Sequence, residues 1–210
     1  MTRIKTRFSR FAARAALVGT LLATALPTPL GAAFAPDQEQ VIAKASSYIN
    51  SITTMQGEFV QVGPDGQRVE GTFIISRPGR LLFRYNPPVR VEIVADGKAV
   101  VIRDKKLKTQ DLYPLGQTPL RFLVSERADL AKDSKVLEVY AENDMSAVVV
   151  EEKTPLGTGK IKLLFDTETF ELKQWTVTDA QGQETSVALY NIETGASVDP
   201  KLFWIDHYRR

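Results

Sequence analysis

Few side chains in this chain of 210 residues could perform catalysis. It contains one histidine, His207, and no cysteine. A metal site at this histidine would need partner ligands at workable spacing, and none accompanies it. A serine triad would have to use it near the C-terminus, where chains are commonly loosely held. Glu151 and Glu152 are adjacent, so on a strand they would point to opposite faces and could not act as a carboxylate pair. Because a glycine-rich phosphate loop is also missing, we expect a protein without enzymatic activity, metal or cofactor.

Arg77 lies in an unusually apolar stretch of the sequence. Residues 71–88 read GTFIISRPGRLLFRYNPP, and counting by twos along a strand puts Arg77 on the same face as Phe73 and Ile75. The guanidinium has five N–H donors and could satisfy the free carbonyls at a helix end. Alternatively, Arg77 could lie at the strand end and reach water beside the Pro-Gly turn. The turn signal by itself favours the second interpretation.

The segments around Arg77 change from helical to strand periodicity. Residues 37–54 predict a helix with Asp37 as N-cap, because its apolar residues recur at helical spacing: Val41, Ala45, Tyr48, Ile49 and Ile52. About six short strands follow up to residue 111, with Asp96-Gly97 as a hairpin turn. A second helix is predicted over 118–126, with Thr118 as N-cap and Pro119 at the first helical position.

Strand patterns resume after this helix. Five more strands are predicted over 135–142, 145–153, 159–166, 171–179 and 184–193. Consecutive antiparallel strands at this spacing favour a mainly β fold with a strongly curved sheet or barrel. The sheet has more apolar residues than one buried face requires, which suits binding of an apolar ligand.

The N-terminal segment has the order of parts of a secretory signal peptide. MTRIKTRFSRFAAR contains five basic and no acidic residues, and an apolar run and the small residues GAAFA follow. Pro27 and Pro29 interrupt the apolar run, which is shorter than the roughly 20 residues of a membrane span. We predict that residues 1–33 are a cleaved signal peptide and that 34–210 form one domain.

Composition excludes some partners and stabilising devices. The chain has 27 basic and 25 acidic residues, of which the predicted signal peptide contains five basic ones. The remaining chain is slightly acidic and has no basic patch with interleaved aromatic residues, so we expect no nucleic-acid partner. Without cysteine there are no disulfides, and burial alone must stabilise the exported protein.

Several short motifs, taken in order, resemble a known family. The sequence is similar to the outer-membrane lipoprotein carrier family, LolA, at Arg77-Pro78, Leu81, Phe83, Tyr85, Pro87-Pro88, Asp96-Gly97-Lys98 and Thr118-Pro119-Leu120. The resemblance implies a half-open, incomplete antiparallel β-barrel of about 11 strands with a helical lid over an apolar cavity. It also implies a periplasmic protein that shields the acyl chains of lipoproteins. An inner-membrane ABC transporter would release the cargo, and an outer-membrane receptor would accept it.

The resemblance assigns roles to residues. Arg77 matches an arginine that holds the lid shut through hydrogen bonds to lid carbonyls, and Leu81 and Phe83 match cavity-lining positions. We extend the candidate acyl-chain cavity to Phe59, Phe73, Tyr85, Val91, Ile93, Leu120, Phe122 and Leu123. Ordinary core packing is the alternative for these residues.

Two departures and two alternatives remain. Residues 99–102 read AVVI where the family often has aromatic residues, and the chain ends soon after Phe203. An exported lipid-binding sensor or interaction domain is the main alternative function, and an enzyme acting on lipid or glycan is less favoured. We expect a monomer.

Overall fold

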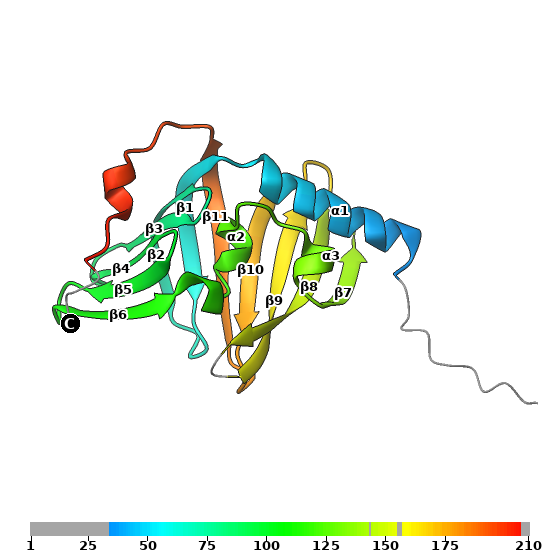
Figure 1. Cartoon of the computed structure of the whole chain (residues 1–210). Coiled ribbons are helices and arrows are strands. Elements are labelled where there is room, and N and C mark those ends of the chain that lie inside the picture. Colours follow the sequence, from blue (N-terminus) through cyan, green and yellow to red (C-terminus); the bar gives the residue numbers. More distant parts are fainter. Residues whose placement is uncertain (1–33, 143, 155–156, 207–210) are drawn as a thin grey trace, which may run out of the picture. The chain divides into compact units, whose positions relative to one another are not determined.

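A single antiparallel sheet of 11 strands organises the protein, in the order β6-β5-β4-β3-β2-β1-β11-β10-β9-β8-β7 (Figure 1). The computed structural model describes residues 34–142, 144–154 and 157–206, so the predicted signal peptide and His207 lie outside the described residues. β6 and β7 are the two edges and do not pair, so the barrel is incomplete. The predicted fold class of about 11 antiparallel strands is confirmed.

The strands divide into two groups around a short helical segment. Six come first: β1 Thr54–Val62, β2 Arg68–Ser76, β3 Arg80–Tyr85, β4 Val91–Asp96, β5 Ala99–Asp104 and β6 Thr109–Pro114. Five follow it: β7 Val136–Ala141, β8 Met145–Thr154, β9 Gly157–Asp166, β10 Leu172–Thr178 and β11 Glu184–Thr194. The helices are α1 Pro36–Ser51, η1 Leu115–Gln117, α2 Arg121–Val124, α3 Leu130–Asp133 and η2 Pro200–Phe203. α1, α2 and α3 lie over one side of the curved sheet (Figure 1).

The first helix begins one residue earlier than the sequence predicts. Ala35, not Asp37, is the N-cap, because Pro36 fills the first helical position, where no N–H is needed. Gln38 then closes the cap, since its Oε1 accepts from the Ala35 backbone N–H at 3.1 Å. The same side chain donates to the carbonyl of Val139 at 3.0 Å and so fixes α1 against β7.

The predicted helix over 118–126 is in the right place but shorter. α2 covers four residues, and 3₁₀-type bonds precede it, from the N–H of Arg121 to Thr118 and from that of Phe122 to Pro119. Thr118 is not the N-cap, because its hydroxyl donates to the Leu115 carbonyl at 2.9 Å and closes η1 instead. Pro119 is therefore part of a 3₁₀ turn and not the first residue of an α-helix.

The inner face of the sheet forms the main core. The register sets Phe73 opposite Phe83 and Ile75 opposite Leu81, so apolar side chains from neighbouring strands meet on one face. All four are buried and join one cluster with residues from α1, α2 and α3. Gly71 lies opposite Tyr85, which lets the sheet bend closely around this core.

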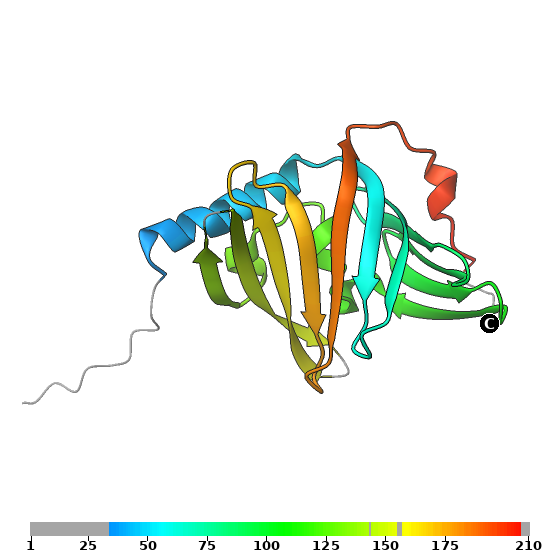
Figure 2. The same ribbon diagram turned by 180° about the vertical axis from the view of Figure 1, so that it is seen from behind.

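A second, smaller core lies on the outer face of β3, β4 and β5. It contains Leu82, Val94 and Val101, and the C-terminal segment covers it with Phe203 and Ile205. Figure 2 shows this segment leaving β11 and crossing to the side of β3 and β4. The outer face of these strands is therefore buried where the C-terminal segment covers it.

We expect Gly71→Ala to destabilise the fold by about 1–3 kcal/mol or more, because the added methyl group overpacks a filled core. A Cβ at Gly71 would overlap the Arg84 backbone carbonyl and lie 2.7 Å from the Phe59 ring. Chemical denaturation measures the change. Gly116→Ala is the matched control, because a Cβ there meets nothing within 4 Å. Equal stability of the two variants would contradict the close approach.

Glu92 gives the outer face a pH-dependent contribution to stability. Burial alone would raise its pKa, but Lys105 and Arg84, whose nitrogens lie 2.7 Å and 2.9 Å from Oε1, lower it below its ordinary value. A carboxylate with a depressed folded-state pKa stabilises above the unfolded pKa, about 4.3, and loses this contribution as pH falls through the folded pKa. We expect Glu92→Gln to cost about 1–2 kcal/mol at neutral pH.

This cost should shrink in acid, because the parent carboxyl is then neutral as well. Unfolding midpoints in denaturant at neutral and acid pH measure it, and Glu168→Gln at an exposed turn is the control. A destabilisation that stays constant in acid would argue against the ion pairs.

Candidate ligand-binding site beneath a helical lid

Arg77 lies directly after β2 and contacts the segment 115–134, here called the lid, which joins β6 to β7. Its Nε and Nη2 donate to the Ser125 carbonyl at 3.0 Å and 2.5 Å, and Nη2 also lies 3.5 Å from the Glu126 carbonyl. Nη1 donates to the Ile52 carbonyl, just after α1, at 3.3 Å. One side chain thus joins the strand end, α1 and the lid. Burial lowers the pKa of Arg77, which stays protonated at physiological pH.

A second polar side chain, Asn50 of α1, also binds the lid. Its Nδ2 donates to the Ala128 carbonyl at 2.7 Å, and its Oδ1 accepts from the Ala128 N–H at 2.8 Å. The Asn50 Oδ1 accepts from Arg77 Nη2 at 3.2 Å as well. Ser46, one turn earlier, accepts from the Leu130 N–H at 3.1 Å. The sequence analysis missed Asn50, although a polar pair at positions i and i+4 beside an apolar helix stripe is a readable signal.

The strand residues predicted to line a cavity lie together on the inner face. Phe59, Phe73, Leu81 and Phe83 are at most 4% exposed, which leaves no water-sized space beside them. Their rings pack edge to face or stacked, with Phe83 5.0 Å from Phe59 and 5.7 Å from Phe73 between centroids. Trp175 of β10, which the sequence analysis missed, packs 6.0 Å from Phe83. In this closed arrangement the protein fills its own interior.

Tyr85 adds a polar group at one end of this face. Its ring packs edge to face on Phe59 at 5.1 Å, and its hydroxyl donates to Gln61 Oε1 at 2.6 Å. Burial raises the pKa of Tyr85 to about 12, although the hydrogen bond to Gln61 opposes this shift. The phenol is therefore neutral at physiological pH.

The inner face is progressively uncovered toward the edge strand β6. Val91 and Ile93, both predicted site residues, are half-buried. Ile93 pairs with Ile102, which is 37% exposed, and Val100 pairs with Tyr113, which is 45% exposed. Apolar surface thus continues from the core to the open side of the sheet.

The lid covers the inner face with its own apolar residues. Phe122, Leu123 and Val124 are buried and Leu120 is half-buried, all within the main core cluster. The Gly79 N–H donates to the Val124 carbonyl at 2.7 Å, next to the contacts of Arg77. The predicted lid residues therefore lie against the predicted strand residues.

The seam between α1 and the lid is loosely packed. A groove of about 780 Å³ runs along it, lined by Ile42, Ala43 and Ser46 of α1 and by Arg127 and Val136 among others. Small residues on α1 leave this space. The hydrogen bonds of Asn50 and Ser46 therefore hold this margin of the lid together with the buried Ala128 and Leu130.

The described residues contain neither a candidate metal site nor a candidate membrane-spanning helix. Within the ranges 34–142, 144–154 and 157–206, no group of three or more histidine, cysteine or acidic side chains could hold a metal ion. No helix in these ranges is long and apolar enough to cross a membrane. The arrangement of the lid over the inner face suits binding of an apolar ligand, which would displace apolar contacts beneath the lid.

Solved structures with a similar arrangement of elements are distant in sequence. A LolA superfamily protein from Nitrosomonas europaea superposes with a TM-score of 0.46 at 11% identity, over 81% of this chain and 98% of that one. A DUF1329 family protein from Desulfovibrio piger reaches a TM-score of 0.49 at 7% identity, over 81% and 97%.

Sequence relatives are closer. An outer-membrane lipoprotein carrier protein from Methylococcus capsulatus is 31% identical over 169 residues, which span 76% of this chain and 80% of the relative. One from Legionella pneumophila is 30% identical over 166 residues, or 75% and 81%. The sequence profile of the family described as outer membrane lipoprotein carrier protein LolA matches residues 50–206. The chain therefore belongs to the LolA family.

Proposed function

We propose that this protein is a periplasmic carrier that binds lipoproteins through their acyl chains and shields these chains from water. One observation carries the proposal: the lid over the apolar inner face is fastened by hydrogen bonds from Arg77 and Asn50 to its backbone. Membership of the LolA family and the names of the relatives support it. The predicted signal peptide over 1–33 supports export of the domain over 34–210.

The hydrogen bonds of Arg77 and Asn50 to the lid would keep the lid closed until a lipoprotein binds. Carbonyls released by Arg77 can bind water instead, so the polar contacts are exchanged at modest net cost. The apolar surfaces of Phe122 and the strands have no such replacement unless hydrocarbon takes the place of the lid. At about 0.8 kcal/mol per methylene, an acyl chain of about 15 methylenes supplies on the order of 12 kcal/mol. A hydrocarbon ligand is therefore the natural competitor for the closed state.

The partners follow from the same energetics. An inner-membrane ABC transporter would supply the lipoprotein, because extraction of acyl chains from a bilayer requires work. The sequence has no phosphate-binding loop with which the carrier could drive release. Non-covalent affinity saturates near ~20 kcal/mol, so two or three fully buried chains would bind too tightly for release. We infer partial burial and downhill transfer to an outer-membrane receptor.

We expect Arg77→Leu to favour the open lid and to increase binding of a hydrophobic dye. Each lost charge-assisted hydrogen bond is worth about 1.5–3 kcal/mol, so the opening equilibrium should shift about tenfold or more. Dye fluorescence in titrations of the folded variant measures this shift. Arg90→Leu, at an exposed position outside the lid, is the control. Equal dye binding by both variants would refute the role of Arg77 as a latch.

Native mass spectrometry of the protein purified from periplasm tests the cargo. We expect co-purified lipoproteins whose added mass includes their acyl chains, and depletion of the protein should leave outer-membrane lipoproteins at the inner membrane. Free lipid as the sole cargo, or lipid turnover without stable cargo, would contradict the carrier and favour a sensor or an enzyme.

A further inference from the structure

The turn between β5 and β6 presents an apolar side chain among lysines. Leu107 lies between Lys106 and Lys108 and is 67% exposed. The turn is ordered, because Asp104 Oδ1 accepts from the backbone N–H groups of Lys106 and Leu107 at 2.7 Å and 2.9 Å. The exposed leucine is therefore held at the tip of a rigid hairpin and does not fold back onto the sheet.

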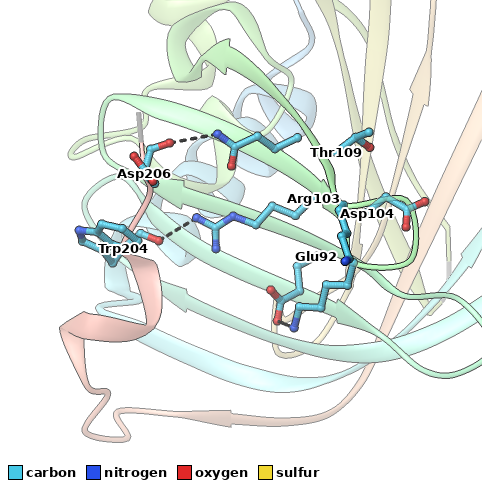
Figure 3. A pocket seen from close by; sticks show the side chains of 9 residues that line it. Glu92, Arg103, Asp104, Thr109, Trp204 and Asp206 are labelled. Carbon is cyan, nitrogen blue, oxygen red and sulfur yellow. Dashed lines mark hydrogen bonds and ion pairs between the residues drawn. The ribbon is translucent and has the colours of Figure 1, made fainter. Parts of the chain in front are cut away.

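Trp204 is equally exposed, at 67%, although both of its neighbours are buried. Phe203 and Ile205 anchor the C-terminal segment in the outer core. Arg103 Nη2 donates to the Trp204 carbonyl at 3.0 Å and fixes the backbone between the two anchors (Figure 3). Two buried neighbours and one backbone hydrogen bond thus hold the indole of Trp204 in a solvent-exposed position.

The hairpin and Trp204 form one surface. A pocket of about 320 Å³ lies between them (Figure 3), and Lys105, Lys108 and Trp204 are among the residues that line it. Gln110 Nε2 donates to the Asp206 carbonyl at 3.0 Å, which joins β6 to the end of the C-terminal segment. We call residues 103–108 together with Trp204 the tip surface.

The acidic side chains at the tip surface are paired or hydrogen-bonded, whereas two of its lysines have no ion-pair partner among the described residues. The buried Glu92 is paired with Lys105 and Arg84, and Asp104 is occupied by the turn. Asp111 and Asp206 are the other acids nearby. Within the described part of the chain no ion pair engages Lys106 or Lys108, which flank the exposed leucine. The outward field of the tip is therefore positive.

We propose that the tip surface binds the face of a lipid bilayer that contains anionic phospholipid. Indole side chains prefer the headgroup region, an exposed leucine can enter the acyl boundary, and lysines near the surface attract anionic headgroups. Leu107, Trp204 and the lysines combine these three features on one rigid edge.

Bilayer contact at this edge would also orient the candidate site. Ile102 and Tyr113, the exposed residues of the inner face, belong to the same hairpin strands β5 and β6. The open side of the sheet would then lie close to the membrane surface. Membrane contact through the tip surface would be possible whether or not the protein carries lipoproteins.

Vesicle flotation tests the proposal with the processed protein purified from periplasm. The probes are vesicles of phosphatidylcholine alone and vesicles that also contain phosphatidylglycerol. We expect binding to the anionic vesicles that weakens with added salt. Lys106→Gln with Lys108→Gln should weaken it about 25-fold, at about fivefold per lysine. Leu107→Ser should weaken it about tenfold.

Matched controls carry the same chemical changes elsewhere. Lys153→Gln with Lys160→Gln removes two exposed lysines from β8 and β9, and Leu137→Ser removes an exposed leucine from β7. Their binding should equal that of the parent. If the control and tip variants lose binding equally, or if the parent binds no better to anionic than to neutral vesicles, the proposal is overturned.

Fluorescence locates the contact. The chain has two tryptophans, and Trp175 is buried, so Trp175→Phe leaves Trp204 as the sole reporter. Its emission should shift to the blue on anionic vesicles and stay unchanged on neutral ones. Unchanged emission on both kinds of vesicle would contradict membrane binding at the tip surface. Tip variants that bind vesicles normally yet fail to deliver lipoproteins would also contradict it and would indicate a protein partner instead. Dye binding beneath the lid should be unaffected by tip variants, which keeps this test separate from the carrier function.

Discussion

An open sheet with an apolar concave face must be covered by something outside the sheet, and this requirement shapes the whole molecule. A closed barrel would bury that face by pairing its edges, but β6 and β7 remain apart. The lid takes over the task, and its own helices are too short to hold their place through helical propensity. Buried apolar residues of the lid, among them Phe122, pack against the core, and Arg77 and Asn50 bind its backbone through hydrogen bonds.

The C-terminal segment covers the outer face of β3, β4 and β5 at Leu82, Val94 and Val101. The turn that carries Arg77 joins β2 to β3, so the side chain that donates to the lid belongs to paired strands of the sheet. The accepting carbonyls belong to a segment that meets α1 along a groove. Any opening should displace the lid and leave the strands in register.

The sequence predicts the strands better than the helices, for a physical reason. Strand positions follow from period-two burial and from turn residues such as Asp96-Gly97, which are local signals. The start of α1 depends on Pro36 and on the Gln38 side chain, which caps the helix and also contacts the Val139 carbonyl, about a hundred residues away in the chain. The lid departs furthest from expectation, because 3₁₀ bonds and tertiary packing decide its conformation over propensity.

The sequence cannot distinguish whether the inward-facing residues form a packed core or line a ligand cavity. A packed core and a lined cavity require the same residue types at the same alternating positions, so Phe73 or Phe83 reads identically in both cases. What distinguishes them is how the cover is attached. A permanent core can seal itself with apolar packing alone, whereas a cover that must leave needs contacts that water can replace. The hydrogen bonds of Arg77 to Ser125 and of Asn50 to Ala128 are contacts of this second kind. If the protein carries lipoproteins as proposed, these hydrogen bonds would let the lid open and close again.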